Sequence, residues 1–291
     1  MMSMIQLIGA LELGIIFGLI GMAVFITFRV SDFPDLTIDG TFPLGAATSA
    51  ALIVYGMNPW LATACAIAAG ALAGMATAYL HVRWKIMPLL AGIIIMTALY
   101  SINLRIMGQP NIAIFDHPTV FDIGLPILVT LSIAAVSVAA CIIYFLATEY
   151  GLGLRASGMN KRVSLALGIH VNKATIVSLA MSNGFVALAG ALYAQSQGFA
   201  DISMGTGIIV VGLAAVIIGQ TLIRTRKIAW LVIACILGAI IYRLAIALAL
   251  NTHALGLQAS DLNALTAIVV ILTLIIPAIK KEISEKRGAL S

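Results

Sequence analysis

Few side chains in this sequence could do chemistry, and those that could stand far apart from one another. The histidines and cysteines are scattered singly, without the spacing of a metal site or a disulfide framework: His81, His117, His170, His253, Cys65, Cys141 and Cys235. The sequence has no H-E-x-x-H or G-x-S-x-G motif, and none of its seven lysines precedes the Ser or Thr that a phosphate-binding P-loop requires. We therefore predict no catalytic residue, no metal and no cofactor. If the protein moves a solute uphill, the energy must come from another subunit or an ion gradient.

One carboxylate, Glu12, falls inside a long apolar segment. Ionisable groups deep inside membrane spans are typical of ion-coupled carriers, although a lone glutamate can also pair within the protein, which is the reading we favour. An autonomous ion-coupled carrier that uses Glu12 and the aspartates is therefore an alternative to an ATP-driven pump. A membrane-embedded enzyme is a third possibility, which the lack of any nucleophile or metal constellation disfavours.

Two segments combine polar residues with helix breakers. Residues 31–50 hold Asp32, Asp35 and Asp39 with two prolines just before a short apolar stretch, and residues 195–212 run from Gln195 through Asp201 to a Gly-rich short helix. Such backbone lines protein or water rather than lipid, and a following half-helix points its N-terminal N–H groups at the pathway. One interrupted segment in each half of the chain predicts a transport pathway built from internal repeats. The alternative is a pair of ordinary polar outer loops.

The elements that position these residues must be membrane helices. Hydrophobic residues make up 62% of the chain, charged residues 9%, and the mean hydropathy is +1.12, which excludes a soluble globular protein. We predict spans at residues 4–28, 60–82, 124–147, 174–195, 228–250 and 262–279, with shorter ones at 86–103 and 205–223. The prediction is one all-α transmembrane domain over residues 1–291, with about eight spanning helices.

The basic residues predict the topology. Thirteen of the 16 lysines and arginines form four clusters, at residues 83–85, 155–173, 224–227 and 280–287, which should all be cytoplasmic, while every aspartate lies in the connections between them. Two crossings then separate each pair of clusters, and both termini are cytoplasmic. This count requires residues 42–57 to form a re-entrant element or half-helix that does not cross. The net charge of +5 reflects these loops, which can contact anionic lipid, and there is no basic stripe with interleaved aromatics for nucleic acid.

The longest predicted cytoplasmic connection is residues 148–173. Asn160 can cap a short amphipathic helix in which apolar residues alternate with Lys161 and Arg162, after a glycine-rich lead. A short helix parallel to the membrane suits docking into a groove on a cytoplasmic partner. The alternative is a positive loop that contacts lipid headgroups.

The G-L-x-x-R-A-x-G-x-N pattern that begins at Gly151 and continues to Ile169 resembles the coupling loop of bacterial ABC importer permeases of the branched-chain amino acid and ribose permease superfamily. The stretches DLTIDGTFPLGAA (residues 35–47), TALYSINLRIMGQPNI (97–112) and 190–220 are similar to the subgroup described as tryptophan/tyrosine transport permeases. The resemblance thus covers most of the chain, and the combination of motifs is more specific than any one of them.

This resemblance implies a homodimer of permease subunits in the bacterial inner membrane, two separate ATPase subunits that bind ATP, and an extracytoplasmic substrate-binding protein. It implies import of a small organic solute, such as an amino acid, with aromatic ones favoured. The coupling element would comprise Arg155, Ala156, Gly158, Asn160 and Gly168, to which we add the adjacent Lys161 and Arg162. The predicted pathway residues are Asp35, Thr37, Asp39, Gly40, Thr41, Asn103, Gln195 and Asp201.

Overall fold

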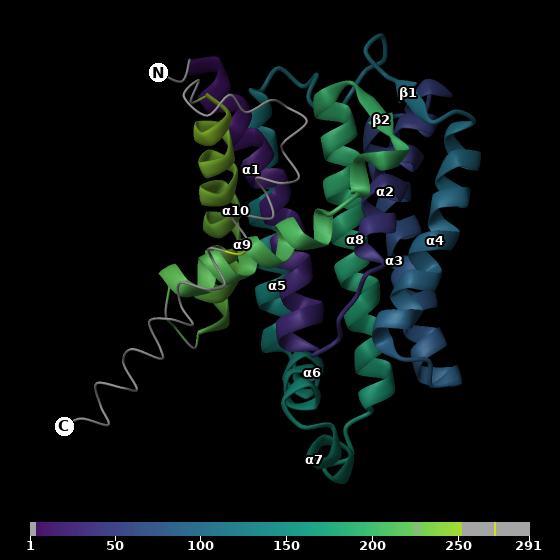
Figure 1. Ribbon diagram of the computed structural model, residues 1–291, viewed down its shortest axis with the longest axis vertical. Coiled ribbons are helices and arrows are strands. Elements are labelled where there is room, and N and C mark those ends of the chain that lie inside the picture. Colours follow the sequence, from purple (N-terminus) through teal and green to yellow (C-terminus); the bar gives the residue numbers. More distant parts are fainter. Residues whose placement is uncertain (1–3, 224, 226, 252–270, 272–291) are drawn as a thin grey trace, which may run out of the picture.

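The computed structural model describes residues 4–223, 225, 227–251 and 271, and it is an all-α membrane protein (Figure 1). Seven of its helices are long and apolar enough to cross a membrane. They are α1 (Met4–Val24) with its π-helical continuation η1 (Phe25–Val30), α3 (Pro59–Trp84), α4 (Pro88–Met107), α5 (Ile127–Ala147), α8 (Val171–Gln197), α9 (Ile208–Leu222) with the 3-10 turn η2 (Ile202–Gly205), and α10 (Ile228–Asn251). These match seven of the predicted spans. The eighth, residues 262–279, lies outside the described residues.

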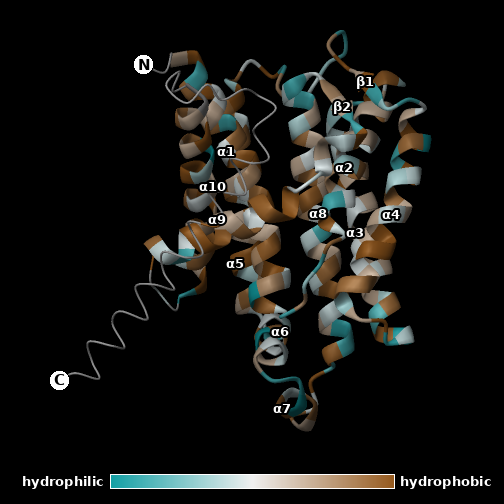
Figure 2. Cartoon of the chain, in the orientation of Figure 1, coloured by the Kyte–Doolittle hydropathy of each residue, from teal (hydrophilic) through white to brown (hydrophobic). Residues whose placement is uncertain are grey.

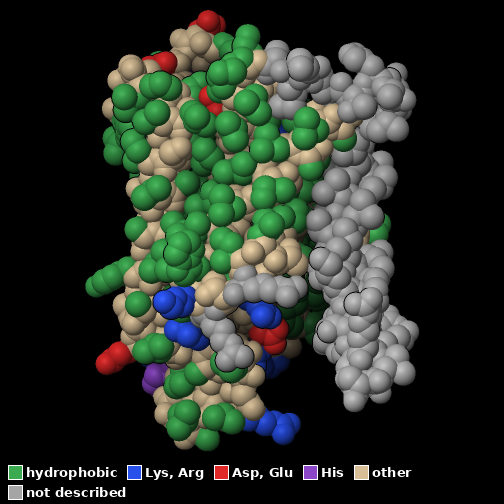
Figure 3. All heavy atoms as spheres, turned by 90° about the vertical axis from the view of Figure 1, so that its left-hand side faces the viewer, with side chains coloured by type: hydrophobic (Ala, Val, Ile, Leu, Met, Phe, Trp, Pro, Cys, Tyr) green, Lys and Arg blue, Asp and Glu red, His purple; other side chains and the backbone are tan. Residues whose placement is uncertain are grey.

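Hydropathy follows this arrangement (Figure 2). Hydrophobic residues fill the middle of the long helices, and hydrophilic residues gather toward their ends and in the connections. Lys and Arg side chains collect near the end that carries α6 (Glu149–Met159) and α7 (Lys161–Ala166), as the face in Figure 3 shows. We call this the basic end.

Two antiparallel helix pairs form the frame, and small residues set how closely they pack. A Cβ on Gly14 would lie 3.0 Å from the Cα of Ile240, and one on Gly18 would lie 3.2 Å from that of Ile236, so α1 runs against α10. In the same way, α3 packs on α8, where a Cβ on Gly74 would approach the Leu179 carbonyl to 2.2 Å. The small-residue spacing visible in the sequence therefore serves packing within one subunit.

The predicted half-helix is present as α2 (Ile38–Val54), a 17-residue helix that starts four residues earlier than expected. Residues 31–37 precede it without helical structure, apart from a turn at 36–37. Residues 31–49 run parallel to α8, since side-chain hydrogen bonds join Ser31 to Ser178, Thr41 to Asn183 and Ser49 to Gln195. The 17-residue helix alone spans roughly 25 Å, and the non-helical residues before it cover the remaining distance from η1 at the basic end.

The prediction that this segment does not cross is therefore wrong. It leaves η1 beside α6 at the basic end, and it reaches the start of α3 at the opposite end (Figure 1). The prediction that the N-terminus shares a face with the loop 148–173 fails with it, because α1 begins at the end opposite α6 and α7 (Figure 1). The count of crossings failed because it treats a non-helical stretch followed by a 17-residue helix as no crossing. Asp32 consequently lies at the basic end, beside Arg155, rather than outside.

Two short strands close the opposite end. Strand β1 (Asn111–Ala113) follows α4 and pairs antiparallel with β2 (Phe199–Asp201), which follows α8, so that Asn111 faces Asp201. The pairing ties the ends of α4 and α8 together and fixes where the chain turns back into the membrane through η2.

Candidate functional site

The two interrupted segments meet at Asp39. This residue lies in the first turn of α2, and its carboxylate accepts hydrogen bonds from the backbone N–H groups of Ile209 (2.8 Å) and Gly207 (3.3 Å) at the start of α9. The N-terminus of a helix carries partial positive charge, so a carboxylate stabilises it. The approach is close, since a Cβ on Gly205 would lie 2.0 Å from the Asp39 carbonyl oxygen. One helix start thus caps another inside the membrane domain.

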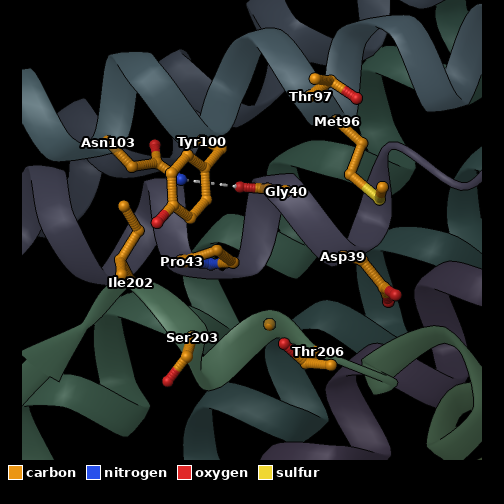
Figure 4. A pocket seen from close by; sticks show the side chains of 11 residues that line it. Asp39, Gly40, Pro43, Met96, Thr97, Tyr100, Asn103, Ile202, Ser203 and Thr206 are labelled. Atoms are coloured by element: carbon orange, nitrogen blue, oxygen red, sulfur yellow. Dashed lines mark hydrogen bonds between the residues drawn. The ribbon is translucent and has the colours of Figure 1, made fainter. Parts of the chain in front are cut away.

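A cavity of about 370 Å³ lies beside this junction (Figure 4). Helix α4 forms one wall, the start of α2 forms another, and η2 with the lead into α9 forms the third. The lining residues are Asp39, Gly40, Pro43, Met96, Thr97, Tyr100, Asn103, Ile202, Ser203, Gly205 and Thr206. Three predicted pathway residues, Asp39, Gly40 and Asn103, are therefore brought together at one site.

Asn103 connects α4 to the start of α2. Its Nδ2 donates to the Gly40 carbonyl (3.2 Å), and this fixes the orientation of the amide because the oxygen could not face that carbonyl (Figure 4). Its Oδ1 is buried and has no hydrogen-bond partner among the described residues. A buried amide oxygen without a donor is unusual, because leaving it unpaired costs about 1–3 kcal/mol.

The other polar residues of the first interrupted segment do not line the cavity. Asp35 is fully buried, and its carboxylate accepts from the Thr37 backbone N–H (2.9 Å) and from Nδ2 of Asn183 (2.7 Å). The Thr41 hydroxyl donates to Oδ1 of the same Asn183 (2.8 Å), and the Thr37 hydroxyl bonds that of Thr77 on α3 (2.6 Å). This network holds the extended segment against α3 and α8, where unpaired polar groups would be costly.

Gln195 and Asp201 also hold structure together. Oδ1 of Asp201 accepts from the Ser203 N–H (2.7 Å) and hydroxyl, and Oδ2 from Asn111 (3.2 Å). Partial burial would raise the pKa of Asp201, but these hydrogen bonds outweigh it, and the pKa lies below its ordinary value. Gln195 receives the Val120 N–H (2.9 Å) and donates to Ser49 and Thr63. Thus Asp201 orients η2 from outside the cavity, and Gln195 lies deeper in the helix packing.

Sequence reasoning missed the α4 wall. Met96, Thr97 and Tyr100 come from the same face of the helix as Asn103, at spacings of three to four residues or two turns. Thr97 and Tyr100 are exposed in the middle of a membrane helix, and Tyr100 is 57% exposed. This spacing of polar side chains along an otherwise apolar span was the signal that could have revealed the wall.

The loop 148–173 forms two helices rather than one. Asn160 caps α7 as predicted, with Oδ1 accepting from the N–H groups of Arg162 (3.1 Å) and Val163 (3.2 Å). The glycine-rich lead, to which we assigned no helix from the sequence, is the helix α6, whose start is capped by Thr148. Lys161 and Arg162 are exposed, and so are apolar residues at the tip, among them Met159 at 89% and Leu167 at 71%. An apolar tip in the aqueous phase is typical of an interaction surface.

The remaining predicted coupling residues lie closer to the membrane helices. A Cβ on Gly158 would lie 2.0 Å from the Val30 carbonyl oxygen, so α6 packs directly on the end of η1. Arg155 lines a cleft of about 500 Å³ together with Arg29 and Asp32. Ala156 is half-buried, and Gly168 ends α7 with a φ of +79° that favours glycine. The predicted coupling residues therefore fall into two groups, one on the exposed tip at α7 and one on α6, where it packs against η1.

Glu12 is half-buried in α1 and has no ion pair with any described residue, so the favoured pairing is not seen. No group of three or more His, Cys, Asp or Glu side chains in the described part of the chain could hold a metal ion.

Comparison with known proteins places these features in context. The family model described as "Branched-chain amino acid transport system / permease component" matches residues 6–278. The chain is 38% identical over 266 residues to the "Tyrosine transport system permease protein" of Clostridioides difficile, covering 91% of this chain and 89% of that one. It is 24% identical over 214 residues to the "Ribose import permease protein RbsC" of Escherichia coli K12, covering 71% and 66%.

A solved structure has the same fold. The complex "PsaBC from Streptococcus pneumoniae in complex with Fab" superposes with a TM-score of 0.52 at 14% sequence identity, covering 92% of this chain and 89% of the other. An "Uncharacterized protein RP368" of Rickettsia prowazekii is 34% identical over 283 residues, covering 95% of this chain and 98% of that one. The sequence matches and the fold thus extend over nearly the whole chain.

Proposed function

This chain belongs to the branched-chain amino acid transport system permease family, and we propose that it forms half of the membrane pathway of a binding-protein-dependent, ATP-driven importer. A second copy of the chain supplies the other half. Two separate ATP-binding cassette subunits hydrolyse ATP at the basic end, and an extracytoplasmic protein delivers the solute at the opposite end. The chain is a multi-pass protein of the bacterial inner membrane and a transport subunit rather than an enzyme.

The observation that carries the proposal is the junction of the two interrupted segments beside a cavity. Helices that start within the membrane, with their N-termini turned toward a shared site, are typical of transport pathways. Here Asp39 joins the start of α2 to the start of α9, and the cavity lies directly beside it. A pathway subunit must offer polar groups at membrane depth, and this geometry supports that role.

The α4 wall supports pairing of two copies. Among the described residues, only one side of α4 packs on its own subunit, and the other side exposes Thr97 and Tyr100 next to the cavity. The Thr97 hydroxyl donates to the Ile93 carbonyl (2.8 Å) of its own helix, but the Tyr100 hydroxyl would find no partner in lipid, whereas it would in a water-containing pathway shared with a second copy. The cavity would then lie between two α4 helices rather than at the lipid boundary.

The tip of α7 supports docking of the ATPase subunits. It presents exposed apolar side chains, Val163, Leu165 and Leu167, next to the charges of Lys161 and Arg162. The chain itself carries no P-loop, which agrees with ATP binding on a separate chain.

For the solute we propose an amino acid, with aromatic ones favoured. The support is the 38% identity to a protein named for tyrosine transport, over nine-tenths of the chain, and the fit of an apolar cavity with a few polar groups to a small organic molecule.

The test is purification of the chain from its native membrane in a mild detergent, with identification of co-purifying proteins. We expect a stoichiometric P-loop ATPase, which Leu167→Glu at the tip releases and Met57→Glu, an exposed apolar residue at the opposite end, retains. Reconstituted uptake of L-tyrosine should require ATP and the binding protein. Uptake without any ATPase, abolished by an uncoupler and by Glu12→Gln, would instead establish the ion-coupled carrier.

A further inference from the structure

We propose that the cavity between α2, α4 and residues 202–206 binds the ammonium end of the solute, so that the permease itself selects solutes that carry an amine. The inference rests on the proposed function, because it assigns a ligand to the same pathway. It goes further in stating which chemical group the membrane subunit reads.

First, the charge of the cavity lining favours a cationic group. Among the described residues that line the cavity, Asp39 is the only formally charged one, and none is a lysine, arginine or histidine. The start of α9, which Asp39 caps, offsets about half a charge. The cavity therefore keeps a negative potential, which the low dielectric of the membrane interior strengthens. Such a cavity attracts a cationic group and offers no counter-charge to a free carboxylate.

The second argument is the unpaired oxygen of Asn103. Its amide nitrogen donates to the carbonyl of Gly40, the residue after Asp39, so the amide oxygen faces away from that carbonyl. Oδ1 needs a hydrogen-bond donor, and none of the described residues supplies one. An ammonium group has three N–H donors and no acceptor, which suits the Asp39 carboxylate. Asn103 lies on the other side of the cavity (Figure 4), where its oxygen would accept from a second donor of the solute, such as a hydroxyl. Because Oδ1 is buried in this conformation, a solute reaches it only when the lining rearranges.

The third argument is the shape and polarity of the rest of the lining. Tyr100, Met96 and Pro43 give apolar and aromatic walls (Figure 4), and the volume of about 370 Å³ is within the range of pockets for small organic ligands. The face of the Tyr100 ring also attracts a cation. The hydroxyls of Thr97, Tyr100, Ser203 and Thr206 are neutral polar groups that the lining offers to the rest of the solute. The cavity thus recognises an amine attached to an apolar body.

The experiment uses the purified importer complex in nanodiscs, without the binding protein, so that the permease alone decides. Binding of tritiated tyramine, which has the amine but no carboxylate, is measured with competition by 3-(4-hydroxyphenyl)propionate, which has the carboxylate but no amine. We expect the acid to compete at least about a hundredfold more weakly than unlabelled tyramine. Asp39→Asn keeps an oxygen to cap α9 but removes the charge, and it should weaken tyramine binding roughly tenfold or more without weakening competition by the acid.

A second variant and a control separate recognition from folding. Asn103→Leu should weaken tyramine binding by about tenfold or more, whereas Ser101→Ala, at an exposed position on α4 outside the cavity, should not. The inference would be overturned if the acid competed as well as unlabelled tyramine or if tyramine did not bind. It would also be overturned if Asp39→Asn left the ratio of the affinities for tyramine and the acid unchanged. If ATP-driven uptake persists in those cases, the importer function stands and only the amine assignment fails. If no ATPase co-purifies and uptake needs no ATP, the proposed function itself is lost.

Discussion

Replacing Gly158 by alanine should separate the predicted coupling element from the membrane helices. A Cβ at this position would lie 2.0 Å from the Val30 carbonyl oxygen and 3.0 Å from its carbon. Real Cβ atoms stay at least 3.0 Å from other heavy atoms, so α6 must retreat from η1 by about 1 Å or tilt away. The obstacle is backbone rather than a flexible side chain, and so neither partner can adapt cheaply.

Forcing an extra carbon into a packed contact costs typically about 1–3 kcal/mol. Gly153 on the same helix is the matched control, because a Cβ there would meet only a methyl group of Ile169 at an ordinary 3.4 Å. Glycine to alanine in a helix without a clash stabilises by about 0.5–1 kcal/mol. Because the gain from replacing a helical glycine applies to both variants, Gly158→Ala should be less stable than Gly153→Ala by the cost of the clash, about 1–3 kcal/mol.

The assay is thermal unfolding of the detergent-solubilised protein, combined with ATP-driven uptake by the reconstituted importer. Gly158→Ala should lower the unfolding temperature and reduce uptake per ATP hydrolysed, and Gly153→Ala should do neither. Equal stability of the two variants would refute the packing argument. Lower stability with full coupling would show that the contact of α6 with η1 is structural only.

Three further outcomes are expected. Asn183→Leu removes a hydrogen-bond donor from the buried Asp35 and the acceptor of the Thr41 hydroxyl. It should lower the free energy of unfolding by about 3 kcal/mol and sharply lower the yield of folded protein, whereas Ser137→Ala at an exposed position of α5 should not. An unchanged unfolding temperature would contradict the network. Because the pKa of Asp201 is lowered in the folded protein, its carboxylate stabilises the fold above the ordinary aspartate pKa of 3.8, and this contribution is lost as the pH falls through the folded pKa. Asp201→Asn should therefore be less stable than the parent at neutral pH and lose less stability on acidification. Unfolding measured between pH 7 and 3 checks this. In a background without Cys65 and Cys141, cysteines at Met4 and Leu167 should react with an impermeant reagent from opposite sides of the membrane; labelling of both from one side would reinstate the cytoplasmic N-terminus.

Most of the helical frame could be predicted from the sequence, because a span of about 20 apolar residues is the main way for a chain to pair its backbone in lipid. The positions of α3, α5, α8 and α10 follow from this constraint alone. The topology of the N-terminal quarter could not be predicted in the same way. Residues 31–37 cross part of the membrane without a helix, and only their contacts with α8 pair their polar groups.

The site was predicted in part, for a related reason. Polar residues beside helix breakers mark where the chain leaves regular structure, and this identified Asp39, but it does not say which side chains face the cavity and which face the protein. Asp35 and Asp39 are four residues apart and look alike in sequence, yet one is enclosed by Asn183 and the other caps α9. Only the three-dimensional course of α8 and α9 distinguishes them, and the sequence contains no local signal for it.

The same distinction explains why the two aspartates suit different tasks. Asp35 has both oxygens engaged by donors from its own subunit and lies between three helices, so it fixes the extended segment in place. Asp39 is held by the backbone of a neighbouring helix start and stays open on its cavity side. Residues 31–37 connect Val30 of η1, on which Gly158 packs, to the start of α2, which carries the Asp39 carboxylate, without an intervening helix. A shift of α6 against Val30 therefore acts on a short segment anchored by Asp35, and the anchor decides whether the shift reaches Asp39. If the importer couples through this segment, weakening the anchor by Asp35→Asn should reduce uptake per ATP more than it reduces ATP hydrolysis, and an equal loss of both would refute this route.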